Sequence, residues 1–486
     1  MIQEENQEKT WNQCLSQTNI FLKYFFKKSY IVENANAIPG FQVVLETSID
    51  LLIRPDSTQN FFILTKKMAI DIGIGFVTGR KHFKNVLTSY INNWVEHGLI
   101  LNKDIRLHLL VAYDLKYSKT ELSDYKNIDP ELAAMVHSIR YYGKASIEEE
   151  RKLLEGKGII SREESELIFG EGYAKKRNAV VYFAKKNKMD RLMFLDDDEY
   201  PIATFKNEYG NLLWMGQSVL NTHLKYIPDA DITHGHHCGY ISPIPYIAFN
   251  DILTENDFKL FVEAISNEII SWDVVKNTII NNKGVTYANP DIVNRSAVKE
   301  VKEINGMKFI SGANLCFNLH NINKLPPFYN PPGARGEDTF MSTSLADLKV
   351  LKVPCYTFHD GFLNYKNILN GILPNALQPV DASSEVIVKR FSNAAIGWIR
   401  YKPLMVYITQ RAEYENIMKD VQEKLEYTIP KLCRYFKNSH FEQIRHELLH
   451  YHNNVKRHYN AFQYTKMAWA KVMADIDKIP EAKNFF

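Results

Sequence analysis

The sequence of 486 residues lacks the features that mark several specialised classes of protein. It has no apolar run of the roughly 18–20 residues that a membrane-spanning helix needs. Its acidic opening, Met1–Asn6, has neither the basic nor the apolar region of a signal peptide. Cysteine is scarce and never spaced as C-x-x-C; the five are Cys14, Cys238, Cys316, Cys355 and Cys433. These absences predict reduced thiols and a cytoplasmic location, and they leave room for a peripheral position at the inner membrane face.

Net charge is also nearly absent, because 59 basic residues stand against 56 acidic ones and leave +3. A balance of this kind predicts no nucleic-acid partner. Hydrophobic residues make up 45% and charged residues 24%, which are the values of a globular protein. A chain of this length exceeds one ordinary core, so we expect several domains. We place an N-terminal extension at 1–66, an α/β domain at 67–370 and an all-α domain at 371–486.

The region 67–370 alternates between strand-like and helix-like patterns. Apolar runs at 72–77, 107–112 and 192–195 predict strands. Between them, residues 83–95 and 173–186 have helical character; the first helix repeats apolar residues on one face, namely Phe83, Val86, Leu87, Tyr90, Ile91, Trp94 and Val95. This alternation predicts a parallel, nucleotide-binding α/β sheet.

After about residue 370 the sequence pattern changes from alternating strands and helices to helices alone. Two proline-containing pairs, at 373–374 and 378–379, mark a linker. Beyond it, one apolar stripe consists of Tyr414, Ile417, Met418, Val421 and Leu425, and a second consists of Ile444, Leu448, Val455 and Tyr459. Both stripes predict helices, which could hold an acceptor, form a homo-oligomer or lean on a membrane surface.

The most informative segment is Arg191–Glu199, RLMFLDDDE, where four carboxylates directly follow a buried strand. Ligands of open α/β sheets bind at the carboxyl ends of the strands. Four adjacent like charges repel one another, and oxygen ligands of this kind suit Mg²⁺ or Mn²⁺, especially with substrate phosphates. A solvated acidic turn is the alternative interpretation for an isolated acidic triplet.

Other candidate residues fall in a fixed order around this acidic segment. Thr78-Gly79-Arg80 forms a turn after the first strand, and Asp114 closes the second. Arg177 and Asn178 belong to GYAKKRN, which opens the helix before the acidic strand. The segment Gly336–Phe340, GEDTF, comes later, and His359 ends a strand after it.

This order of motifs resembles the GT-A glycosyltransferases, and most closely their family 2, over about residues 70–365. The resemblance implies an inverting enzyme that uses Mn²⁺ or Mg²⁺ and a nucleotide-diphosphate sugar, most simply a UDP-sugar. It implies donor binding by Thr78, Arg80, Asp114, Arg177, Asn178, Asp196 and Asp197, and metal binding by Asp196, Asp198 and His359. Asp338 would be the general base, with Glu337 beside it. The first strand–turn–helix departs from the sequence pattern that is usual in this family. The sequence does not identify the acceptor, which could be a glycan, a lipid-linked group or a protein.

Two further patterns offer other interpretations. His446-Glu447-x-x-His450 matches the helical motif of zinc peptidases, but Asn453 and Lys456 stand where the metzincin extension needs Gly and His. A third ligand would have to be Glu481. His234, His236 and His237 leave metal binding, an acceptor contact and a plain loop open, and we favour the loop or the acceptor contact over a dedicated metal site. A zinc peptidase and a catalytically silent GT-A scaffold are therefore the alternatives to a transferase.

Overall fold

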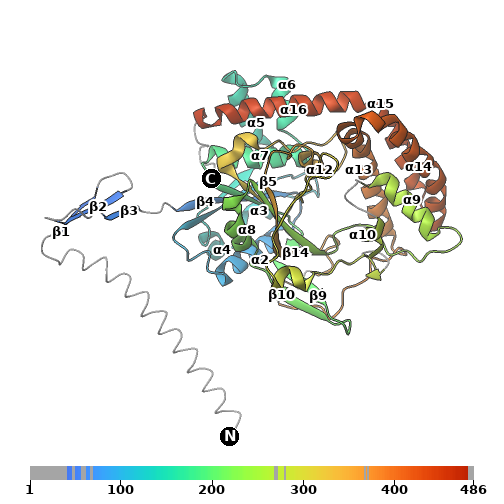
Figure 1. Cartoon of the computed structure of the whole chain (residues 1–486), viewed down its shortest axis with the longest axis horizontal. Helices are drawn as coiled ribbons and strands as arrows, with labels where there is room; N and C mark the ends of the chain where they lie inside the picture. Colours follow the sequence, from blue (N-terminus) through green and yellow to red (C-terminus); the bar gives the residue numbers. More distant parts are fainter. Residues whose placement is uncertain are drawn as a thin grey trace, which may run out of the picture. The chain divides into compact units, whose positions relative to one another are not determined.

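The computed structural model describes residues 69–266, 272–277, 281–365, 368 and 371–479, and the backbone of three strands nearer the N-terminus (Figure 1). The chain divides into two compact units, Met1–Ala69 and Ile70–Phe486. In the first unit, β1 (Phe41–Leu45), β2 (Asp50–Pro55) and β3 (Phe62–Thr65) form an antiparallel sheet. Cys14 and Glu481 lie outside the described residues.

The second unit is built around a sheet whose order, among the described strands, is β12-β14-β11-β13-β7-β4-β5-β6, with β8 paired to β14. The strands are β4 (Ile70–Thr78), β5 (Ile105–Tyr113), β6 (Ser138–Tyr142), β7 (Arg191–Leu195), β8 (Glu199–Tyr200), β11 (Ile232–Gly239), β12 (Lys299–Glu300), β13 (Leu315–Asn318) and β14 (Val350–His359). Strands β7, β4, β5 and β6 run parallel, as the alternation predicts. The whole sheet is mixed, however, because β13 is antiparallel to both β7 and β11. Alternation along the chain carries no information about this pairing, which joins strands far apart in sequence.

Helices cover both faces of the sheet (Figure 1). Side chains of β4 alternate between two cores, with Ile72, Ile74 and Phe76 facing the buried side of α2 (Phe83–Glu96). On the opposite face, a Cβ on Gly75 would lie only 2.7 Å from Cγ1 of Val180 in α7 (Tyr173–Lys186), so glycine lets this helix approach closely. Val95, expected on the buried face of α2, is 41% exposed.

The C-terminal helices belong to the same compact unit as the sheet. They are α13 (Glu385–Thr409), α14 (Tyr414–Phe436), α15 (Gln443–Asn453) and α16 (Val455–Asp475). The second predicted stripe spans two of these helices, because the chain breaks between α15 and α16 at Asn454. Helix α9 (Glu255–Ile265), from the middle of the chain, shares a core with α13 and α14. Within the described residues, no helix is both long enough and apolar enough to cross a membrane.

Shorter elements fill the connections between these layers. They are α3 (Ser123–Lys126), α4 (Pro130–Ala134), α5 (Lys144–Gly156), α6 (Arg162–Ile168), the hairpin β9 (Ile202–Lys206) and β10 (Leu212–Gly216), α8 (Val219–Tyr226), α10 (Trp272–Lys276), α11 (Pro290–Asn294) and α12 (Glu337–Ser342).

One edge of the sheet collects the candidate residues. Strands β4, β7, β11 and β14 all run in the same direction. The strand between β7 and β11, β13, is antiparallel to both, so those two are parallel to each other. Their carboxyl ends therefore meet at one edge, and Thr78, Asp196 and His359 stand at the ends of β4, β7 and β14. The site is assembled from this edge.

Candidate functional site

The acidic cluster after β7 lies inside the protein rather than on a solvated turn. Asp197, Asp198 and Glu199 are each at most 6% exposed. An ionised carboxylate is stable in such a place only when cations or hydrogen-bond donors surround it. Each of the four acids has a partner of this kind.

Arg80 and Thr78, from the end of β4 and the turn after it, hold two of the carboxylates. Arg80 Nη1 lies 2.8 Å from Oδ1 of Asp197 and also pairs with Asp198. The Thr78 hydroxyl donates to Oδ2 of Asp197 at 2.5 Å. Burial nevertheless dominates at Asp197 and raises its pKa to about 7, although Arg80 opposes the shift. Arg80 thus supplies a positive charge directly at the acidic strand end.

His359, at the end of β14, faces Asp198. Its Nε2 is 3.5 Å from Oδ2 of Asp198, and its Nδ1 bonds the carbonyl oxygen of Tyr240. Burial alone would lower the pKa of His359, but Asp198 reverses this and raises it to about 9. Burial would likewise raise the pKa of Asp198, and His359 and Arg80 together bring it well below its usual range. Asp198 is therefore paired with two positive charges, those of His359 and Arg80.

Asp198 and His359 fit a divalent cation. Two ligands that each bind an ion at about 2.0–2.1 Å stand roughly 3 Å apart when they occupy neighbouring positions, close to the 3.5 Å observed. Asp196 does not join them, because its carboxylate faces Tyr173 and Arg177 instead. Among the described residues no three His, Cys, Asp or Glu side chains are grouped to hold a metal. An ion here would take two protein ligands and complete its shell with phosphate and water oxygens.

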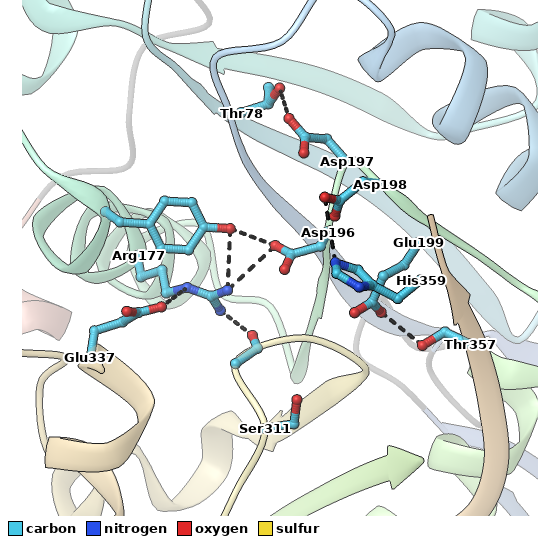
Figure 2. Close-up of polar contacts among 12 residues, drawn as sticks. Thr78, Arg177, Asp196, Asp197, Asp198, Glu199, Ser311, Glu337, Thr357 and His359 are labelled. Carbon is cyan, nitrogen blue, oxygen red and sulfur yellow. Dashed lines mark hydrogen bonds and ion pairs between the residues drawn. The ribbon is translucent and has the colours of Figure 1, made fainter. Parts of the chain in front are cut away.

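Arg177, in α7, connects the acidic strand to the distant Glu-Asp segment (Figure 2). Its Nη2 is 3.5 Å from Asp196 and its Nε is 3.4 Å from Glu337. The guanidinium also donates to the carbonyl of Gly312 and lies about 5 Å from the ring centres of Tyr173, Phe194 and Phe328, at 4.8, 5.0 and 5.3 Å. With only 2% of its side chain exposed, Arg177 joins two motifs far apart in the sequence.

Glu337 and Asp338 occupy the first turn of α12, after Gly336 in a left-handed conformation with φ 89°. Oδ1 of Asp338 accepts from the backbone N–H of Thr339 at 2.8 Å. Burial raises the pKa of Asp338, and burial together with the Asp338 charge raises that of Glu337 to about 7. A buried carboxylate whose pKa approaches neutrality is suited to accepting a proton.

Of the predicted donor residues, Asn178 points away from the acidic cluster, whereas Asp114 lies at the same sheet edge as Thr78. Asn178 is fully buried and bonds the backbone of Phe328 in both directions, at 2.9 and 2.8 Å. It positions the segment that leads to the Glu-Asp motif and does not face the acidic cluster. Asp114 follows β5, and its backbone N–H donates to the carbonyl of Thr78 at 2.9 Å, which places it at the same sheet edge. Its carboxylate accepts from Nζ of Lys176 at 2.7 Å.

The three clustered histidines lie on strand β11 and not in a loop, which corrects that interpretation of the sequence. His234 is buried, His236 stacks on Tyr356, and His237 contacts Glu199. This strand could not be recognised from the sequence, because histidine and glycine have little preference for strands. Tyr173 was likewise not foreseen, yet its hydroxyl donates to Oδ1 of Asp196 at 2.5 Å.

The zinc-peptidase motif is not assembled as a metal site within the described residues. His446 and His450 are exposed on α15, and Glu447 accepts from Nη2 of Arg400 at 2.8 Å. A catalytic zinc needs three protein ligands, and the described part of the chain provides no such group. The geometry gives this alternative no support.

Comparisons with known proteins add little. The sequence matches no family model and no curated protein. Among solved structures, mouse xyloside xylosyltransferase 1 in its apo form is similar at 10% identity and a TM-score of 0.18. The match covers 40% of this chain and 58% of that one. Any functional proposal for this chain therefore rests on the geometry of the site.

Proposed function

We propose that the protein is a GT-A glycosyltransferase similar to family 2, which moves a sugar from a nucleotide-diphosphate donor, a UDP-sugar, to an acceptor hydroxyl with inversion. One observation carries the proposal: buried Arg177 joins Asp196 of the acidic strand end to Glu337 of the Glu-Asp segment. If the acidic strand end were only a solvated turn and the Glu-Asp segment only a charged helix start, the two would not be expected to share one buried cation. The proposal covers a cytoplasmic enzyme whose acceptor is a glycan, a lipid-linked group or a protein.

The leaving diphosphate needs positive charge as the glycosidic bond breaks. A Mn²⁺ or Mg²⁺ ion bound by Asp198 and His359 would supply Lewis-acid stabilisation there. Arg80 already lies against Asp197 and Asp198 and can turn to the phosphates. Asp114, with Thr78 near it, is available for the nucleoside.

At the other side of the site, Asp338 would take the proton of the acceptor hydroxyl while that oxygen attacks the anomeric carbon. Burial makes Asp338 a stronger base, since it raises the pKa of the carboxyl group. Arg177 lies 3.4 Å from Glu337 and so limits the repulsion between the carboxylates of Glu337 and Asp338. A single displacement of this kind inverts the anomeric configuration.

A thermal-shift experiment with UDP-sugars tests this function. Donor plus Mn²⁺ should stabilise the folded protein by about 2.7 kcal/mol at about 100 times its Kd. Asp198→Asn should abolish the part of the shift that depends on Mn²⁺. Asp251→Asn, at an exposed acid outside the site, should leave the shift intact.

The outcomes separate the alternatives. A full Mn²⁺-dependent shift in Asp198→Asn would overturn the metal assignment. No stabilisation by any nucleotide sugar, with or without metal, would favour a silent scaffold over an enzyme.

A further inference from the structure

Three side chains beside the proposed transferase site form a continuous hydrogen-bonded chain. Oγ of Ser311 lies 2.7 Å from Nε2 of His237, and Nδ1 of the same ring lies 3.0 Å from Oε1 of Glu199. Glu199 belongs to β8, His237 to β11, and Ser311 to the loop before β13. The atoms are connected as in a Ser–His–acid triad, where one ring nitrogen faces the hydroxyl and the other the carboxylate.

The acid end of this chain is rigidly held. Glu199 is 4% exposed, and its second oxygen, Oε2, accepts from the Thr357 hydroxyl at 2.7 Å. The same hydroxyl lies 3.1 Å from Nδ1 of His237. A buried carboxylate at Nδ1 favours the tautomer that carries its hydrogen there, which leaves the Nε2 lone pair facing Ser311.

The serine end is open. Ser311 is partly exposed, and His237 is the one hydrogen-bond partner of its hydroxyl among the described residues. Arg177 donates to the carbonyl of the next residue, Gly312, so a fixed guanidinium stands beside the Ser311 loop (Figure 2). That cation can stabilise negative charge that develops near the serine.

A purely structural role explains these contacts less well. The side chain of His237 is 18% exposed, so water could satisfy Nε2 without any serine. A buried glutamate that needed only neutralisation would not require a hydroxyl at the far side of the ring. The aligned order of carboxylate, imidazole and accessible hydroxyl is what nucleophilic catalysis requires.

We propose that Ser311 is a nucleophilic serine that accepts the acyl group of a carboxylic ester, with His237 as its general base and Glu199 as a positioning residue. Ser311 Oγ forms a bond to the ester carbonyl carbon, and its proton passes to Nε2 of His237. The ester C–O bond then breaks, and the alcohol leaves with that proton. Water, activated by His237, cleaves the acyl-serine to a carboxylic acid and restores Ser311. This activity is separate from sugar transfer and does not depend on it.

A fluorophosphonate probe tests the proposal on the intact chain, because it phosphonylates activated serines with loss of fluoride. The native protein should be labelled at Ser311, as located by mass spectrometry of the digested protein, and heat-denatured protein should not. Ser311→Ala should abolish that label. His237→Gln should slow labelling by about 10²–10⁴-fold, the usual contribution of a general base.

Ser242→Ala is the matched control: Ser242 is also partly exposed, but among the described residues its hydroxyl bonds the N–H of Ile244 and no histidine. It should leave labelling unchanged. Native protein that carries no label at Ser311 overturns the proposal, whatever the variants do. A label on Ser311 that persists at the native rate in His237→Gln overturns it too, since the serine would not then be activated by the histidine.

Discussion

At the scale of single residues, Arg177 shows how this fold keeps a charge in its interior. The guanidinium has two carboxylates, a backbone carbonyl and three aromatic rings around it. Loss of either carboxylate would leave a buried cation poorly compensated, which is costly in a low-dielectric environment. The residue therefore couples Asp196 to Glu337 energetically as well as in space.

Asp338→Asn should lower the rate of sugar transfer by about 10²–10⁴-fold, because the amide cannot accept the acceptor's proton. Donor binding should hardly change, since Asp338 lies in the Glu-Asp segment and not at the acidic strand end. Initial rates and a donor titration of the same variant measure both. Loss of donor binding would move Asp338 to the donor site and leave Glu337 as the next candidate base, and a product with retained configuration would exclude the single displacement.

Glu337 should make stability depend on pH. Its folded pKa of about 7 exceeds the ordinary glutamate value, so the folded state binds this proton more tightly than the unfolded state. The resulting stabilisation is complete below about pH 4.5 and is lost as pH rises through 7. Urea unfolding of the native protein and of Glu337→Gln at pH 5 and at pH 8 should reveal this dependence. The stability of the native protein relative to the variant should fall by about 2.5 kcal/mol between pH 5 and pH 8. An unchanged difference at the two pH values would contradict this assignment.

At the scale of elements, α7 carries Tyr173 and Arg177 into the site from a start that only glycine permits. Gly172 precedes the helix with φ 100° and ψ 156°, a conformation that other residues rarely adopt. No heavy atom lies within 4 Å of the position of a Cβ at Gly172. The constraint is thus one of backbone conformation and not of space.

Gly172→Ala should therefore destabilise the protein by about 1–3 kcal/mol through backbone strain alone. Gly156→Ala is the control: it also has open space, lies at the end of α5 and does not need a positive φ. That variant should be neutral or more stable by up to about 1 kcal/mol. Chemical denaturation of both variants gives the comparison, and equal effects would refute the backbone explanation.

At the scale of the whole molecule, the C-terminal helices are part of the α/β core. Trp469 of α16 is 3% exposed in the core that also contains Val180 of α7. Its indole Nε1–H donates to the carbonyl of Leu325 at 2.9 Å. Helix α13 meets the Glu-Asp loop as well, because the N–H of Arg335 donates to the carbonyl of Gly397 at 3.3 Å.

Trp469→Ala should cost about 3–5 kcal/mol, the usual penalty for removing a large buried side chain. Met467→Ala, on the same helix but 58% exposed, should change stability by no more than about 0.5 kcal/mol. Unfolding curves that follow both the sheet and the helices should shift together in Trp469→Ala. Loss of the helices alone, with the sheet intact, would show that the two parts fold independently.

Local patterns in the sequence were sufficient for the central elements. The apolar run 192–195 lies within β7, and the helix expected at 173–186 has those bounds. Both could be predicted because burial of a strand and of a helix leaves a periodic signal in neighbouring residues. The His-rich strand β11 left no such signal, and neither did the break at Asn454.

What the sequence by itself determined is the set of chemical groups and the sheet edge at which most of them gather, since that edge follows from where each strand ends. Only the tertiary structure decided which groups meet: Asp198 with Arg80 and His359, Arg177 with Glu337, and Ser311 with His237. It also turned Asn178 toward Phe328 and Asp196 toward Tyr173 and Arg177. The physical reason is that such contacts join segments far apart in the chain, and side-chain direction depends on the packing of all the elements between them.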